Sequence, residues 1–332
     1  MVAVPFIFDN GVGIAAAHLH RSQIKRYAHG MRLHEPFEEL WFELLLFEAS
    51  AGDQFLNIGA AAGYYSLLAL RQRPRLRVVA VNPHPNFRAM LRANAALAGI
   101  NVTDATSLGE ATKPAPGGIL QLPYAVENAS STRMLLGDGW GDGLHATLSP
   151  KRLASGSGRG GKPRNPAHVR TARMEDLVRT VCQLGPKGSP CSILLANWDI
   201  QGHEETVFAD EGTQRVLASH CIKRVIVGSH GCDYGGRVVR CADFGPRAAA
   251  RHGCNASRPN ETKSLGQLLR GNSSECGRAH GVVLRALRRA GYRILYQAER
   301  LPGQPDGLIV GISPRETPAT AAVLTLLGPG FT

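Results

Sequence analysis

The segment FLNIGAAAGYYSLLAL, residues 55–70, passes from an apolar strand into a helix through a turn with two glycines. The pattern predicts a strand over Gln54–Ile58, a helix over Tyr64–Arg71 and a tight turn at Gly59 and Gly63. Such a turn lets a ligand approach the backbone and the unpaired N–H groups of the helix start. The spacing is G-x-x-x-G rather than G-x-G-x-x-G, which weakens a nicotinamide or flavin site. Packing of the strand against the helix is the alternative explanation.

Strands and helices alternate along much of the remaining chain, which predicts an α/β protein with a parallel, doubly wound sheet. Apolar, β-branched runs predict strands at Arg77–Val81, Ile119–Val126, Ser192–Trp198, Lys223–Gly228, Tyr292–Gln297 and Gly307–Gly311. Helical periodicity predicts helices at Glu35–Ala49, Asn86–Ala98, Glu204–Leu217 and His280–Ala290.

Composition supports a folded domain with a large core, because 43% of the 332 residues are hydrophobic. The formal net charge is +12, which fits either anionic partners or an arginine-rich surface without a specific role. The longest apolar run, residues 40–47, contains Glu43 and is too short to span a bilayer, so no membrane span is expected. Residues 1–10 do not have the pattern of a signal peptide.

Five of the seven cysteines, Cys221, Cys232, Cys241, Cys254 and Cys276, fall in one stretch without a C-x-x-C pair. This spacing disfavours zinc, and no metal site is expected. Glycosylation-type triplets in the same stretch favour a lumenal compartment, whereas the missing signal or anchor favours the cytoplasm. In a lumen we expect the last four cysteines to pair among themselves or with Cys221. A surface loop with free thiols is the alternative.

The chain divides into an N-terminal segment with a leading helix at 1–50, a main domain at 51–313 and a tail at 314–332. A flexible loop is expected at 155–166 and a Cys/Gly/Arg-rich insertion at 231–277. Because the insertion follows a strand end, we expect it to cover a cleft, where its arginines would select an anionic or sugar-bearing acceptor.

Several blocks in order resemble the FkbM-type S-adenosylmethionine-dependent methyltransferases. They are HEPFEELWFELLL, GDQFLNIGAAAGYYSLLAL, VVAVNPHPNFRAMLRANAALAGI, LPYAVENASSTRML, VRTARMEDLV and ILLANWDIQGHEETVF, in which DIQGHE, residues 199–204, is the most distinctive. The resemblance implies a class I methyltransferase (Rossmann-like) fold, with a mostly parallel seven-stranded sheet between two helix layers. It also implies S-adenosyl-L-methionine as the cofactor and methyl transfer, usually to a hydroxyl oxygen.

Within that resemblance, the expected cofactor-binding residues are Asn57, Gly59, Gly63, Tyr64, Asn82, His84 and Glu127. The family usually has Asp at position 57 and Glu at position 82, and its Lys is replaced by Asn197. Asn57 and Asn82 are expected at the carboxyl ends of adjacent parallel strands, facing one cleft. An acidic residue at position 82 is expected to strengthen cofactor binding. His84 shapes an adenine pocket or belongs to a turn between two prolines.

The expected catalytic residues are Asp199, His203 and His230. Asp199 follows a central strand, where its carboxylate takes a proton from the acceptor, orients it, or caps the next helix. His203 is an alternative base in the same turn, and His230 follows the next strand at the same sheet edge. Three aromatic residues, Tyr64, Tyr65 and Trp198, are also expected near the cofactor. They either contact the sulfonium or adenine or pack in the core.

These residues predict an O-methyltransferase acting on a hydroxyl of a small molecule or glycan. The alternative is a methyltransferase-fold protein that binds cofactor weakly and serves as a binding or scaffold module. A nucleic-acid methyltransferase is disfavoured, because basic motifs with interleaved aromatic residues are missing. The oligomeric state has no signature in the sequence.

Overall fold

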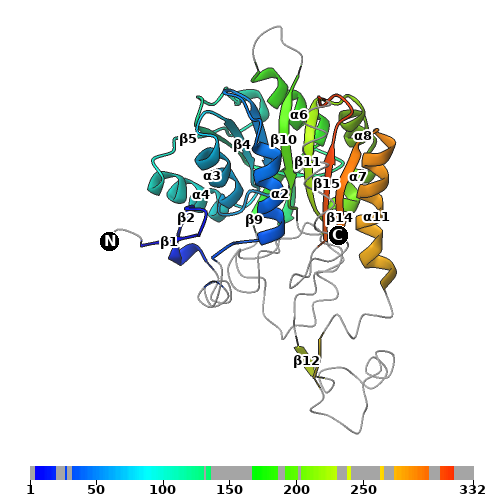
Figure 1. Cartoon of the computed structure of the whole chain (residues 1–332), viewed down its shortest axis with the longest axis horizontal. Coiled ribbons are helices and arrows are strands. Elements are labelled where there is room, and N and C mark those ends of the chain that lie inside the picture. Colours follow the sequence, from blue (N-terminus) through cyan, green and yellow to red (C-terminus); the bar gives the residue numbers. More distant parts are fainter. Residues whose placement is uncertain are drawn as a thin grey trace.

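The computed structural model describes residues 4–19, 27, 32–130, 132–135, 167–185, 191–200, 203–229, 238–240, 262–264, 273–298 and 307–317 (Figure 1). The predicted loop 155–166, His230 and the insertion cysteines Cys232, Cys241 and Cys254 lie outside these residues. Cys276 lies in a helix whose side chains are not described up to residue 278.

One mostly parallel sheet organises the chain, and its strand order is β14-β15-β11-β10-β3-β4-β6-β5. β15 runs antiparallel to both neighbours, and the other strand pairs of this sheet are parallel. This arrangement confirms the doubly wound, class I methyltransferase (Rossmann-like) fold. The described sheet has eight strands rather than the seven expected, because the three-residue β5 pairs with β6 at one edge. The bounds are β3 Gln54–Ile58, β4 Arg77–Val81, β5 Val102–Asp104, β6 Ile119–Leu122, β10 Ile193–Trp198, β11 Ile222–Ser229, β14 Arg293–Ala298 and β15 Gly307–Ile312.

Alternate residues of the strands point to opposite faces of the sheet and contribute to two separate apolar clusters. Each cluster also contains helix residues, so helices cover both faces of the sheet. One cluster joins the sheet to α2 (Pro36–Leu46), α3 (Tyr64–Gln72) and α4 (Pro85–Leu97). The other joins it to α6 (Met174–Gln183), α7 (Glu204–Ala209), α8 (Glu211–Ala218) and α11 (Ser273–Arg289).

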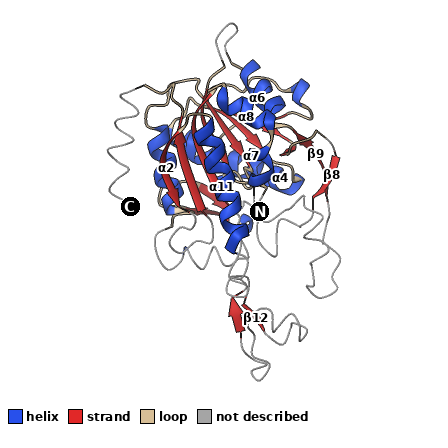
Figure 2. Ribbon diagram, turned by 90° about the vertical axis from the view of Figure 1, so that its right-hand side faces the viewer, coloured by secondary structure: helices blue, strands red, loops and turns tan. Residues whose placement is uncertain are grey.

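The strand predicted over Ile119–Val126 is in fact two strands, because Pro123 has no N–H to continue the ladder. β6 stays in the main sheet, whereas β7 (Tyr124–Val126) pairs with β9 (Ala167–Ala172). β8 (Thr132–Leu135) completes this small sheet, and Figure 2 shows β8 and β9 at the rim of the molecule.

The helix predicted over Glu204–Leu217 is also two helices, α7 and α8. Asp210 separates them, because its backbone is extended and its carboxylate accepts a hydrogen bond from the N–H of Thr213 at 2.9 Å.

The N-terminal segment contains a hairpin of β1 (Pro5–Ile7) and β2 (Gly13–Ala15), followed by the 3₁₀ turn η1 (Ala16–His18). A second 3₁₀ turn, η2, spans Leu108–Glu110. Within the predicted insertion, β12 (Val238–Arg240) pairs antiparallel with β13 (Thr262–Ser264), and α11 begins at Ser273.

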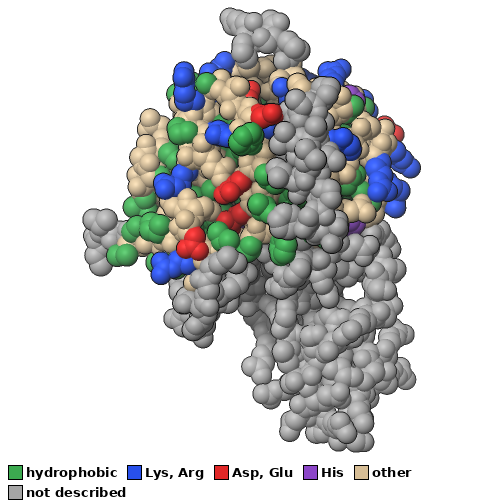
Figure 3. All heavy atoms as spheres, in the orientation of Figure 1, with side chains coloured by type: hydrophobic (Ala, Val, Ile, Leu, Met, Phe, Trp, Pro, Cys, Tyr) green, Lys and Arg blue, Asp and Glu red, His purple; other side chains and the backbone are tan. Residues whose placement is uncertain are grey.

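The surface in Figure 3 shows lysine and arginine side chains spread around this face, with acidic side chains between them. Among the described helices, none has the length and apolarity needed to cross a membrane.

Candidate functional site

The candidate site lies where the chain reverses its direction of winding, between the central strands β3 and β10. These strands are parallel neighbours, with Asn57 opposite Asn197 and Ile58 opposite Trp198. The N–H of Asp199 continues the ladder by donating to the carbonyl of Ile58 at 2.9 Å. In doubly wound sheets, the carboxyl ends of strands at such a reversal form the usual ligand crevice.

A turn with three left-handed residues connects β3 to α3. The φ values are +83° at Gly59, +44° at Ala61 and +93° at Gly63, which is the N-cap of α3. A Cβ on Gly59 would overlap the carbonyl oxygen of Asp199, and one on Gly63 would stand 2.8 Å from Leu91 Cγ. Gly59 is therefore required by close contact with the backbone of Asp199, Gly63 is favoured by close contact with the Leu91 side chain, and both are favoured by their conformation.

A cavity opens above this turn. Its lining comes from the turn, from the two central strands and from the N-terminal segment. The turn and strands contribute Asn57, Gly59, Ala60, Ala61, Ala62, Tyr64, Tyr65, Asn197 and Asp199, and the N-terminal segment contributes Phe8, Ile14, His18, Leu19 and His34. Of these described lining residues, Asp199 alone carries a carboxylate.

Asn197 is the most unusual polar residue of the site. Its side chain is fully buried, and within the described part of the chain neither its Nδ2 nor its Oδ1 has a hydrogen-bond partner. Asn57, beside it, donates from Nδ2 to the hydroxyl oxygen of Ser66 at 2.9 Å. Because an unsatisfied buried amide costs about 1–3 kcal/mol, Asn197 indicates a place where a polar ligand group would be stabilised.

Asn82 follows β4, the parallel neighbour of β3, so both predicted asparagines lie at carboxyl ends of adjacent strands. The Asn82 Nδ2 donates to the carbonyl of Ala61 at 2.8 Å, and this bond ties the turn between Gly59 and Gly63 to the end of β4. Asn57 lines the cavity but Asn82 does not. His84 is the N-cap of α4, and its Nδ1 accepts from the N–H of Asn86 at 3.2 Å.

Tyr64 is tied to the N-terminal segment, because its hydroxyl accepts from Asn10 Nδ2 at 2.7 Å. Asn10 Nδ2 also lies 2.9 Å from the Glu39 carboxylate. Burial and the negative charge of Glu39 raise the pKa of Tyr64 far above its ordinary value. The Tyr64 hydroxyl is therefore protonated throughout the physiological range.

The remaining predicted residues are placed in three different ways. Asp199 lines the cavity, and the N-cap of α7 is His203, so the alternative in which Asp199 caps that helix is wrong. His203 Nε2 lies 3.9 Å from Glu127 Oε1, and neither residue is among those lining the cavity. Trp198 is fully buried and packs against Phe208 with ring centroids 5.5 Å apart, so it belongs to the core.

Sequence reasoning missed the N-terminal part of the lining and the burial of Asn197. For Asn197 a signal existed, since an amide inside the apolar run ILLANW needs a reason to be buried. The N-terminal residues carry no comparable pattern, and only the folded chain brings them to the turn.

No protein-family model matches the chain, and no curated protein matches it in sequence. Among solved structures, it is similar to the pyocyanin biosynthetic protein PhzM (13% identity, TM-score 0.31, covering 83% of this chain and 55% of that one). It is also similar to Aeropyrum pernix fibrillarin with natively bound S-adenosyl-L-methionine (11% identity, TM-score 0.31, covering 82% of this chain and 74% of that one). A third similar structure is an O-methyltransferase family protein from Burkholderia thailandensis (14% identity, TM-score 0.29, covering 88% of this chain and 62% of that one).

These likenesses are distant, and the chain spans less than two thirds of the first and third of these structures. The fold assignment therefore rests on the strand order of this chain.

Proposed function

We propose that the chain is an S-adenosyl-L-methionine-dependent methyltransferase of the FkbM type that methylates a hydroxyl of a small molecule or glycan. The observation that supports this function best is the buried, unpartnered carboxamide of Asn197 beside the glycine turn at the sheet reversal. The amino-acid part of S-adenosyl-L-methionine has an ammonium group that donates hydrogen bonds and a carboxylate that accepts them, so it could satisfy both polar atoms of such an amide.

The residues around the turn fit that cofactor in shape and in polarity. Gly59 and Gly63 allow the tight turn that borders the cavity, and Asn57 and Asn197 lie opposite each other in register. The side chains at positions 57 and 82 are neutral amides, which give weaker bonds to a cationic amino group or to ribose hydroxyls than carboxylates do. Asp199 is then the residue whose negative charge favours a cationic ligand in this cavity.

S-adenosyl-L-methionine supplies an electrophilic methyl group on its sulfonium sulfur. The chain's own contribution is to position the groups and to accept a proton from the acceptor hydroxyl. Asp199 lines the cavity and is the proposed base. His203 and Glu127, 3.9 Å apart, form a second acid–base pair outside the lining. The protonated Tyr64 hydroxyl is bound to Asn10, which fixes the ring at the cavity wall.

Titration calorimetry with S-adenosylhomocysteine tests the proposal, with micromolar binding as the expected result. Asn197→Leu should weaken binding about tenfold or more, because it removes the amide that contacts the ligand. Gln121→Met is the matched control, since Gln121 is also fully buried with an unpartnered amide but does not line the cavity. The control should bind as the wild type does.

Asn57→Asp is expected to tighten binding about fivefold, because a charge-assisted bond is stronger than a neutral one by about 1 kcal/mol. The Ser66 hydroxyl can reverse its role and donate to the new carboxylate. Methyl transfer itself is then measured with labelled cofactor and a panel of hydroxyl-bearing acceptors.

A binding module without transferase activity is the second candidate. It is favoured by the two asparagines, whose Nδ2 groups are engaged by Ser66 and Ala61 rather than directed to a ligand. Wild-type protein that shows no binding up to millimolar S-adenosylhomocysteine would reject the transferase and support this alternative.

A further inference from the structure

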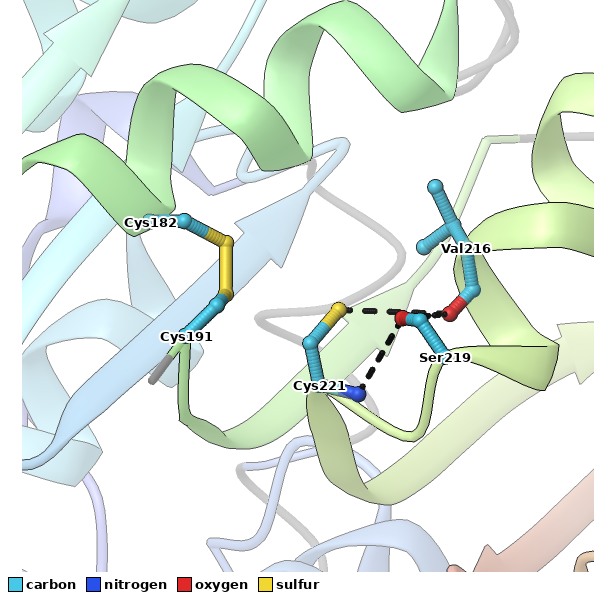
Figure 4. Close-up of a disulfide and its surroundings, with 5 residues drawn as sticks. All are labelled: Cys182, Cys191, Val216, Ser219 and Cys221. Atoms are coloured by element: carbon cyan, nitrogen blue, oxygen red, sulfur yellow. Dashed lines mark hydrogen bonds between the residues drawn. A yellow bond between two sulfur atoms is a disulfide. The ribbon is translucent and has the colours of Figure 1, made fainter. Parts of the chain in front are cut away.

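Three cysteines gather at the sheet edge opposite the candidate site, near the amino ends of the central strands. Cys182 lies in the last turn of α6, Cys191 precedes β10 and Cys221 precedes β11. Cys182 and Cys191 form a disulfide, Cys221 is a free thiol, and their sulfur atoms all lie within 4.8 Å of one another (Figure 4). In thiol–disulfide exchange a thiolate attacks a disulfide sulfur, so this proximity places Cys221 where it could take part.

A cavity of about 550 Å³ adjoins the disulfide, and Cys182 is part of its wall. Among the described lining residues, three are cationic, Arg75, Arg77 and Lys113, and one, Asp53, carries a carboxylate. The described wall of the cavity therefore carries a net positive charge beside a half-buried disulfide. Such a field concentrates anions and raises their encounter rate.

We propose that this cavity is a thiol–disulfide exchange site for a small anionic thiol, with Cys182 as the sulfur attacked and Cys221 as the resolving thiol. In the first step the thiolate of the ligand bonds to Cys182 Sγ, the Cys182–Cys191 bond breaks, and Cys191 leaves as a thiolate that takes a proton from water. The result is a mixed disulfide at Cys182, and no oxidant or reductant is consumed.

In the second step the Cys221 thiolate bonds to Cys182 Sγ and the ligand leaves as a thiolate. The protein disulfide has then moved from Cys191 to Cys221, which links α6 to the start of β11 instead of β10. Cys221 is mostly buried, and burial raises the pKa of its thiol. Little Cys221 thiolate therefore forms at neutral pH, so the second step speeds up as the pH rises.

Glutathione, which is anionic, and cysteamine, which is cationic, are the probes for the first step. After an acid quench, peptide mapping follows the mixed disulfide at Cys182 separately from adducts at other cysteines. Per thiolate, glutathione should react roughly tenfold faster than cysteamine, and added salt should reduce the difference. Equal rates, or a disulfide that reacts only in denaturant, would overturn the proposal.

The double variant Arg75→Ala/Lys113→Ala should slow the glutathione reaction several-fold and leave cysteamine unchanged or faster. Arg285→Ala/Arg289→Ala, which removes two exposed charges from α11, is the control with the same net charge. If both double variants slow glutathione equally, the effect is that of overall charge and the cavity has no role.

Cys221→Ala tests the second step. Wild-type protein should yield a Cys182–Cys221-linked peptide after exposure to glutathione, at a rate that increases with pH. The variant should form the mixed disulfide at the normal rate, and only Cys191 should resolve it. Failure to detect the Cys182–Cys221 link in wild-type protein would refute the role of Cys221.

Discussion

Gly59 and Asp199 are in direct backbone contact, because the turn after β3 passes against the carbonyl group that follows β10. Gly59→Ala should therefore destabilise the protein by about 3 kcal/mol or more, from the left-handed backbone and the overlap together. Gly99→Ala is the control, since Gly99 also has a positive φ, +69°, but nothing lies within 4 Å of its added Cβ. It should cost only about 1 kcal/mol in urea unfolding. Equal losses of unfolding free energy in the two variants would show that the Asp199 carbonyl shifts to make room for the added Cβ.

Ala61 adopts a φ of +44°, which is unfavourable for a residue with a Cβ. Ala61→Gly should raise the free energy of unfolding by up to about 1 kcal/mol, because the strain exceeds the entropy cost of the glycine. Ala62→Gly, one residue further and without a positive φ, should instead lower it. Urea unfolding of the two variants compares these effects, and a destabilised Ala61→Gly protein contradicts the expectation.

Arg224 makes a buried connection between β11, α2 and the start of the C-terminal tail. Its guanidinium lies 3.0 Å from the Glu316 carboxylate and 3.4 Å from that of Glu48, and it also donates to the carbonyl of Leu45. Glu316→Gln should cost about 3 kcal/mol, because Arg224 is left as a buried charge with a weaker partner. Glu48→Gln, at a side chain that is 39% exposed, should cost under about 1 kcal/mol in the same unfolding assay.

His220 gives a pH-dependent contribution to stability. Burial, and next the positive charge of Arg315, lower its pKa from the ordinary value of about 6.5. Below that value the unfolded chain binds a proton that the folded chain does not, so the free energy of unfolding falls as the pH drops from 7 through 6.5 and beyond. His220→Asn keeps the positive φ of +54° accessible and should reduce this fall. Identical pH profiles for the two proteins would exclude the imidazole.

The sheet and the glycine turn were predictable because their signals are local. The strand Gln54–Ile58 has its predicted bounds, and α3 ends one residue beyond the prediction, since periodicity and two glycines determine both. The site residues depend on distant parts of the chain. The hairpin, for example, is fixed where Asn94 Oδ1 accepts from the N–H of Ala15, 79 residues away.

The disulfide was missed for a similar reason. Cys182 and Cys191 stand apart from the cluster of five cysteines and are nine positions apart, a spacing that does not predict a bond. The end of α6 and the start of β10 bring their Cα atoms to 4.8 Å, a distance that follows only from how the helix packs on the sheet.

One side of the candidate cavity is lined by residues 8–19, which precede the alternating strands and helices in the chain. Phe8, Ile14 and Leu19 lie across the turn, and Phe8 packs on Tyr64 with ring centroids 4.8 Å apart. A ligand in this cavity would contact these apolar side chains on one side. A fragment that starts at β3 lacks the contacts made by residues 8–19, so we expect it to release a bound ligand faster than the full chain does.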